Sequence, residues 1–332
     1  NMFRARRNND DFAIKIVVWL MGSMAFYGIY EGVTQNNPLF LRFFSENALT
    51  DYKNSFLYTY NTVGSMEEAL IFAMLLSMSS IFILMMGNKR NKYLLYIVFG
   101  IAMFFTNKRS ALLMWILVYV IYEVLDAWFI SNKRTYAVRL FKIMFGIAIG
   151  IFILSIVKIK GNTILSLVTG KFTGLFSEDS RSYMQRYGAL IIALELILQK
   201  NSIFGFLFGN GLSSLVGNFV TNRRTITDLN FYVIDNQYIT SWYDSGFVFL
   251  ILCVFICVHF IIELTKIIVD KHIEISLRKK SLVLLIGMIL VMFYSFIIDV
   301  LTWYQPIFII SFIIALSNWN IKEAKKECEY TR

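Results

Sequence analysis

Long apolar stretches separated by shorter polar ones dominate the chain. The apolar runs cover residues 12–30, 69–86, 93–105, 111–130, 143–157, 238–269, 282–298 and 307–316. Each run is long enough, or nearly so, for the ~20 helical residues that cross a hydrocarbon core of ~30 Å. The pattern therefore predicts an all-α integral membrane protein, a polytopic helix bundle of about eight spans in which residues 1–332 form a single membrane domain.

Basic residues cluster between the apolar runs and indicate an orientation in the membrane. The clusters lie at residues 4–7, 88–92, 133–142, 271–280 and 322–326. Counting spans places all of them on one side, which the positive-inside rule makes cytoplasmic. The loops at 31–65, 106–110, 160–238 and 299–306 are then external. We expect residues 160–238 to form one long external loop that carries most of the active site.

The composition supports this interpretation and excludes other classes. The chain is 57% hydrophobic and only 16% charged, which is less charge than soluble domains carry. Its net charge of +10 is better explained by cytoplasmic loops than by nucleic-acid binding, because no basic run is interleaved with aromatic residues. Three cysteines and two histidines are too few and too scattered for a metal site, so we expect no metal and no cofactor.

The long loop contains a predicted amphipathic helix that begins near Arg181. Asp179 or Ser180 can cap it, and apolar residues recur at helical spacing up to Leu198. A cation in the first turn opposes the helix dipole, so helix stability does not explain Arg181. A guanidinium beside free backbone N–H groups suits a phosphate. Arg186 faces elsewhere; it is a candidate for binding substrate, with lipid headgroups as the alternative.

Further polar residues lie at the predicted outer ends of spans. Arg109 follows Lys108 at the start of the fourth run, where it either extends toward the interface or binds an anion. Asp235 precedes the sixth run, as a solvated loop residue or as a general base. Charged groups at membrane depth are functional candidates, which applies to Asp244 and more weakly to Asp299. The glycines between 205 and 211 favour a tight turn over direct ligand contact.

Several short segments also occur in an order that is known from one group of membrane enzymes. They are Gly64-Ser-Met-Glu-Glu-Ala69, Thr106-Asn-Lys-Arg-Ser-Ala-Leu-Leu113, Ser180-Arg181 followed by Tyr187-Gly-Ala-Leu190, the Gly205–Gly211 segment, and Asp235-Asn-Gln-Tyr238 followed by Asp244-Ser-Gly246. In order, spacing and placement they resemble the O-antigen ligase/polymerase family of membrane glycosyltransferases, the Wzy/WaaL type, over residues 64–250. The resemblance implies a GT-C-like helix bundle with its active site at the outer face of the bacterial cytoplasmic membrane.

Departures from the family pattern decide between its members. Ser180 stands where a Gly is usual and Tyr187 where a Trp is common. Asp235 occupies the position at which ligases resemble one another in having His, which favours a polymerase of polysaccharide repeat units. The alternatives are an O-antigen-type ligase and, in another class, a transporter or flippase of lipid-linked or anionic solutes.

The resemblance implies a metal-independent transfer of glycan from undecaprenyl pyrophosphate to another lipid-linked repeat unit. Catalytic roles fall to Arg109 and Arg181 on the pyrophosphate and to Asp235 as the base. The expected substrate-binding residues are Arg186, Arg223, Arg224, Asn236, Tyr238 and Asp244. The expected partners are undecaprenyl-pyrophosphate-linked oligosaccharides, the lipid bilayer, and chain-length regulator and flippase proteins.

Overall fold

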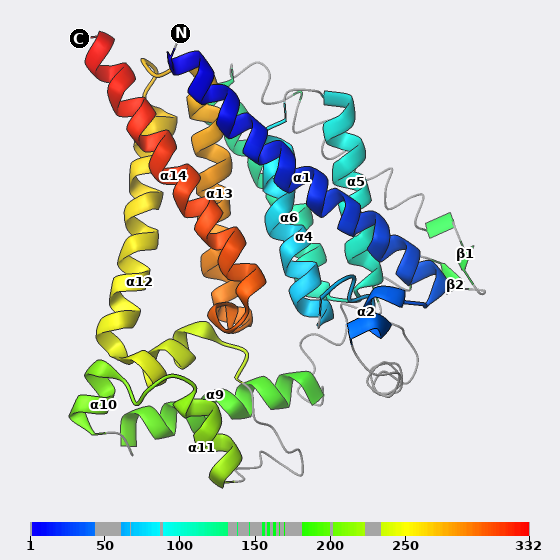
Figure 1. Ribbon diagram of the computed structural model, residues 1–332, viewed down its shortest axis with the longest axis vertical. Helices are drawn as coiled ribbons and strands as arrows, with labels where there is room; N and C mark the ends of the chain where they lie inside the picture. Colours follow the sequence, from blue (N-terminus) through cyan, green and yellow to red (C-terminus); the bar gives the residue numbers. More distant parts are fainter. Residues whose placement is uncertain are drawn as a thin grey trace. The chain divides into compact units, whose positions relative to one another are not determined.

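The computed structural model describes residues 2–43, 61–66, 68–86, 89–131, 181–199, 202–222 and 234–331, with scattered residues between 138 and 169 (Figure 1). The helices are α1 (Met2–Thr34), α2 (Pro38–Phe43), α4 (Ala69–Leu84), α5 (Lys89–Phe105), α6 (Arg109–Leu125), the π-helix η1 (Asp126–Ile130), α9 (Arg181–Gln199), α10 (Ile203–Phe208), α11 (Ser214–Asn222), α12 (Gln237–Val269), α13 (Ile275–Ile297), the 3₁₀ helix η2 (Val300–Thr302) and α14 (Tyr304–Thr331). A short antiparallel hairpin pairs β1 (Lys158–Ile159) with β2 (Asn162–Thr163).

The described helices follow the apolar runs of the sequence. Every expected run except 143–157, most of which lies outside the described residues, coincides with a helix. Among the described residues, five helices are long and apolar enough to cross a membrane: Phe12–Thr34, Arg109–Ile130, Gln237–Val269, Ile275–Ile297 and Tyr304–Glu329. The apolar helices Ala69–Leu84 and Asn91–Phe105 are shorter. The fold is thus compatible with an all-α membrane protein.

The chain folds as two compact units. The first comprises Asn1–Arg139, Phe260–Leu290 and Tyr304–Arg332, and the second comprises Leu140–His259 and Val291–Trp303. Two helices, α12 and α13, contribute residues to both units, whereas the sequence pattern predicts one membrane domain.

Helix α4 is the centre of the first unit. Every residue of α4 is buried, and α1, α5, α6 and α14 all pack against it. A helix that is apolar on all sides is stable only when it is surrounded, which explains why this uninterrupted apolar run lies at the core. Phe82 of α4 packs edge-to-face against Phe312 of α14, with ring centroids 5.2 Å apart.

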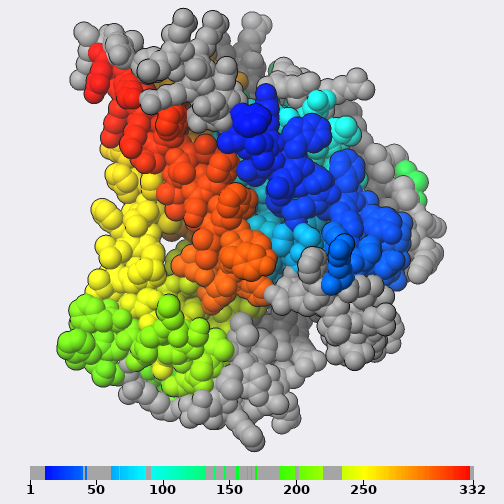
Figure 2. Space-filling model, in the orientation of Figure 1, coloured from blue at the N-terminus to red at the C-terminus, as the bar shows by residue number. Residues whose placement is uncertain are grey.

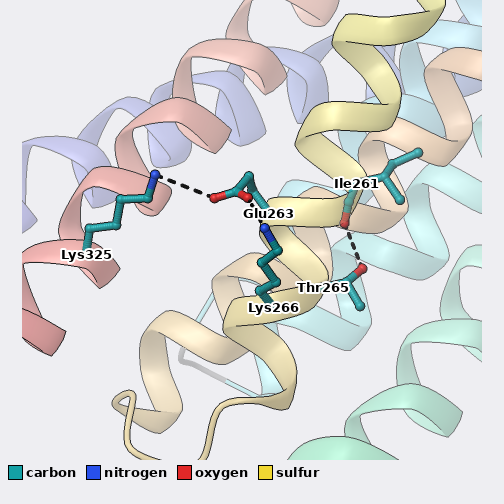
Figure 3. Close-up of polar contacts among 5 residues, drawn as sticks. All are labelled: Ile261, Glu263, Thr265, Lys266 and Lys325. Carbon is teal, nitrogen blue, oxygen red and sulfur yellow. Dashed lines mark hydrogen bonds and ion pairs between the residues drawn. The ribbon is translucent and has the colours of Figure 1, made fainter.

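Polar contacts hold helix ends together in the first unit. The buried guanidinium of Arg278 donates to the carbonyl oxygens of Ile268 at 2.9 Å and Phe129 at 2.6 Å. Both acceptors lie at helix C-termini, where a cation complements the dipole. Figure 3 shows Glu263 of α12 paired with Lys266 at 2.5 Å and with Lys325 of α14 at 3.5 Å. Both lysines are exposed, so these pairs contribute at most about 1 kcal/mol.

The second unit has its own core around the first turns of α12. Helix α9 begins at Arg181, as the sequence predicts, and its buried face packs with α11 and α12 (Figure 1). The buried side chains of this core are Ala189, Ala193, Leu196, Ile197, Leu215, Phe219, Ile234, Ile239 and Tyr243.

Candidate functional site

Helix α12 is broken near its start, and the break organises the second unit. Gly246 adopts a left-handed conformation, with φ of 90°, inside the helix. The break frees the carbonyl groups of Tyr243 and Asp244 from helical bonding. The turn after α10 satisfies them: the backbone N–H and the side-chain amide of Asn210 each donate to Tyr243 at 3.0 Å, and the Gly211 N–H donates to Asp244 at 3.0 Å.

Two glycines allow this close contact between backbones. A Cβ atom on Gly246 would collide with the carbonyl oxygen of Leu207, and one on Gly209 would collide with the carbonyl oxygen of Asp244. Both glycines also have positive φ, which L side chains rarely adopt. The turn expected between 205 and 211 is therefore a structural element that holds α10 against α12.

Asp244 is the buried anion of this arrangement. Its carboxylate accepts hydrogen bonds from the backbone N–H groups of Ser213 and Leu215, both at 2.8 Å, and from the Ser214 hydroxyl at 2.9 Å. These donors form the start of α11, so Asp244 caps that helix from a distant part of the chain. The predicted role of Asp244 in substrate binding stays a prediction, while the geometry gives it a structural role.

The segment Asp235–Tyr238 fastens the start of α12 to the end of α13. Asn236 accepts from the Ile239 N–H at 3.1 Å and donates to the Phe296 carbonyl oxygen at 3.3 Å. The Tyr238 hydroxyl donates to the Met292 carbonyl oxygen at 2.8 Å. The roles of Asn236 and Tyr238 toward substrate stay predictions, beside these observed anchoring roles.

Gln237 extends the same anchoring to the segment that contains Asp299. Its side-chain oxygen accepts from the Leu301 N–H at 2.6 Å, and its side-chain amide donates to the Ser241 hydroxyl at 2.7 Å. Asp235, which precedes these anchors, is half-buried. The segment thus contains a half-buried carboxylate next to three side chains that anchor the start of α12.

Asp299 is the most perturbed group of the site. The residue is only 5% exposed, and its Oδ1 atom has no hydrogen-bond partner among the residues that the structure describes. The pKa of Asp299 is raised from 3.8 to about 7, mainly by burial, with smaller contributions from the negative charges of Asp244 and Asp235. Perturbed carboxyl groups of this kind are frequent at functional sites.

The nearby Thr240 side chain forms a hydrogen bond that lowers the pKa of Asp299 and so opposes the effect of burial. However, the Thr240 hydroxyl donates to the Asn236 carbonyl oxygen at 3.1 Å, and a hydroxyl has only one proton to donate. The oxygen of Thr240 is then left as an acceptor for a proton on Asp299.

Sequence reasoning gave Asp299 less weight than Asp244, and both roles stay predictions, while the structure shows that the pKa of Asp299 is strongly raised. The available signal was a lone carboxylate in the short polar gap between two apolar runs. Nothing in the sequence distinguished Gln237 or Thr240, because their roles depend on hydrogen bonds with Leu301 and Asn236 that only the fold reveals.

Arg109 lies at a second polar position, in the first unit. It is the first residue of α6, whose N-cap, Lys108, makes no side-chain capping hydrogen bond. The Arg109 side chain is half-buried and has no hydrogen-bond or ion-pair partner among the described residues. A guanidinium beside uncapped N–H groups can bind an anion.

The remaining predicted arginines are described only in part. Arg181 and Arg186 belong to α9, but their side chains lie outside what the structure describes, as do Arg223 and Arg224 entirely. Arg109 lies in the first unit and Asp235 in the second. The predicted convergence of these residues on one pyrophosphate therefore stays a prediction.

Within the described residues, no group of three or more His, Cys, Asp or Glu side chains is arranged to hold a metal ion. The chain matches no family model and no curated protein. The site is therefore interpreted from its own chemistry around the start of α12: Asp244 caps a helix, Asp299 is a buried carboxyl group with a raised pKa, and Asp235 is half-buried.

Proposed function

We propose that this chain is a membrane glycosyltransferase that polymerises polysaccharide repeat units at the outer face of the bacterial cytoplasmic membrane. In this proposal it has about eight spans in a GT-C-like bundle, and residues 160–238 are external. The observation that carries the proposal is the buried Asp299 carboxyl group beside Asp235 at the start of α12, within a chain whose helices can cross a membrane. The order of motifs that resembles the O-antigen polymerases supports it.

The reaction needs an acceptor for one proton. A sugar hydroxyl of the acceptor repeat unit forms a bond to the anomeric carbon of the donor. The bond from that carbon to the lipid pyrophosphate breaks, and the pyrophosphate leaves with the bonding electrons. The hydroxyl proton passes to a carboxylate. Asp235 is suited to this step because it is half-buried and within electrostatic reach of Asp299.

Asp299 is too deeply buried to touch a sugar, so its role is electrostatic. When Asp299 is ionised, its negative charge favours proton uptake by the neighbouring Asp235. When Asp299 is protonated, that effect disappears. The proton affinity of Asp235 is therefore higher when the buried Asp299 is ionised than when it is protonated.

The leaving group requires positive charge. A lipid pyrophosphate carries several negative charges, and preplaced guanidinium groups stabilise that charge as it develops. Arg109, at the uncapped start of α6, offers a guanidinium and backbone N–H groups together. Arg181, at the start of α9, would contribute in the same way, with Arg223 or Arg224 assisting.

The proposal is tested with purified protein in lipid nanodiscs supplied with undecaprenyl-pyrophosphate-linked repeat units. Asp235→Asn, Arg109→Ala and Arg181→Ala are each expected to lower the rate of chain extension about tenfold to a hundredfold, since charge-assisted contacts contribute ~1.5–3 kcal/mol each. Glu329→Gln, at an exposed position of α14, is the control and should extend chains normally. Normal extension by a folded Asp235→Asn variant would refute the assignment of the base.

The rival functions predict different products in cells that lack the gene. Loss of a polymerase leaves single repeat units on the surface, loss of a ligase leaves long chains unattached, and loss of a flippase removes all surface glycan. A broken helix such as α12 also occurs in transporters. Here, however, the freed carbonyl groups of Tyr243 and Asp244 bind Asn210 and Gly211, so the break is filled by the protein.

A further inference from the structure

Helices α9 and α10 carry several large apolar side chains that are exposed in the part of the chain that the structure describes. Figure 2 shows the atoms of α10 at the surface, coloured green, beside the yellow atoms of α12. Ile203, Phe204 and Leu212 are 77%, 73% and 88% exposed. The other exposed members are Tyr187, Ile191, Leu198 and Phe208. We call this set of residues the α9–α10 apolar face.

This face lies in a stretch that is almost free of charge. Between Arg186 and Arg223 the only charged residues are Glu195 and Lys200, and none occurs from 201 to 222. The opposite side of α9 is also apolar, because it packs in the core of the second unit. A helix that is apolar on two sides, followed by 22 residues without charge from 201 to 222, is unusual for a loop surrounded by water.

The lengths of these helices exclude a membrane crossing. The apolar part of α9, Tyr187–Leu198, is ~18 Å long, and the six-residue α10 is shorter, against the ~30 Å of a hydrocarbon core. Such segments can enter one leaflet and return. Arginines at 186 and 223–224 flank the stretch, as expected where a chain meets phospholipid headgroups.

The backbone of the turn at Asn210 and Gly211 has its polar groups paired within the protein, as an environment without water requires. In hydrocarbon, irregular backbone is tolerated only where its polar groups are satisfied by protein. Asn210 and Gly211 meet this condition by donating to the freed carbonyl groups of α12. Phe206 packs against Trp242 and Phe247, with ring centroids 5.3 and 5.7 Å away, so α10 is fixed to α12 by apolar contacts as well.

We infer that the α9–α10 apolar face is inserted into one leaflet of the membrane and contacts phospholipid acyl chains. Val248, Phe249 and Leu252 of α12 are also exposed, as expected for the lipid-facing side of a span. This segment of the predicted external loop is therefore a membrane-embedded hairpin. The inference depends on the chain being a membrane protein and not on its catalytic function.

Spin labelling of the purified full chain in nanodiscs of phosphatidylcholine and phosphatidylglycerol tests this inference. A background of Cys253→Ala, Cys257→Ala and Cys328→Ala removes the native thiols. Single cysteines then replace Phe204 or Leu212, and a nitroxide is attached to each. The exposed Phe255 within α12 is the lipid reference, and the exposed Lys271 in the turn after α12 is the water reference.

The readout is the collision rate of each nitroxide with oxygen, which is enriched in lipid, and with a water-soluble nickel chelate. At Phe204 and Leu212 the oxygen-to-nickel ratio should be close to that at Phe255 and several-fold above that at Lys271. A ratio like that at Lys271 would show a water-exposed loop and overturn the inference. Low collision rates with both reagents would show a covered face, such as a contact with a second copy, and would also overturn it. If either labelled variant misfolds, Ile203 replaces it.

Discussion

Replacing Asp299 with Asn should stabilise the protein and impair its activity at the same time. Asn resembles the protonated carboxyl group in shape, and its amide can donate to the Thr240 oxygen as the protonated acid would. The substitution therefore keeps the packing and removes the ionisation. In most buried polar positions a substitution costs stability, so a gain here would be diagnostic.

The size of the gain follows from the pKa of Asp299. A carboxyl group with a pKa of about 7 in the folded protein and 3.8 when unfolded costs about 4 kcal/mol at pH 8, and less than half of that at pH 5. Between these two pKa values the folded protein holds a proton that the unfolded chain has lost. The stability of the parent protein therefore falls as pH rises from about 4 to about 7, and then levels off.

The assay is the apparent Tm in nanodiscs, followed by tryptophan fluorescence at several pH values and one fixed scan rate, because unfolding of such proteins is often irreversible. At pH 8 Asp299→Asn should raise Tm by several degrees, with a smaller rise at pH 5. Glu329→Gln should leave Tm unchanged. If Asp299→Asn and the parent lose Tm equally between pH 5 and pH 8, Asp299 is not the titrating group. Chain extension should fall although stability rises.

Three further substitutions test the surroundings of this group. Asp244→Asn should destabilise the protein by about 2–4 kcal/mol in denaturation assays, because it weakens charge-assisted bonds to the start of α11. Gly246→Ala should lower the free energy of unfolding by about 3 kcal/mol or more, because the position has a positive φ and the new Cβ atom would collide with α10. In the same assays the control Gly217→Ala, in open space on α11, should be neutral or stabilising. Asp235→Asn should move the midpoint of the pH-dependent loss of Tm to lower pH, because it removes a negative charge near Asp299. An unchanged midpoint would show that the two carboxyl groups do not interact.

The helices were predictable from the sequence because the residues that define each one are consecutive in the chain. Apolar runs mark α4, α5, α6, α12, α13 and α14, and the polar residues before Arg181 mark the start of α9. The predicted count of about eight spans depends partly on residues 143–157, most of which the structure does not describe. Periodicity also indicated the apolar character of α9 without showing that two of its sides are apolar.

The break in α12 was not predictable, because its cause is distant in the sequence. Residues 238–269 read as one uninterrupted apolar run, and a single Gly inside a helix is usually tolerated. The break is stable because Asn210 and Gly211 donate to the freed carbonyl groups. The role of Asp244 depends on the same distant contact, through the N–H groups of Ser213 and Leu215.

The three carboxyl groups near the start of α12 have different roles because their surroundings supply different numbers of donors. Asp244 is surrounded by three donors from the start of α11, so it is a fixed part of the structure. Within the described part of the chain, one oxygen of Asp299 receives no hydrogen bond, and the charge of Asp244 further disfavours the ionised form. The anion that holds α11 in place thus helps to keep a proton on Asp299. Under the proposed function, the half-buried Asp235 is the carboxylate that exchanges a proton with the substrate, and its proton affinity depends on whether Asp299 is charged.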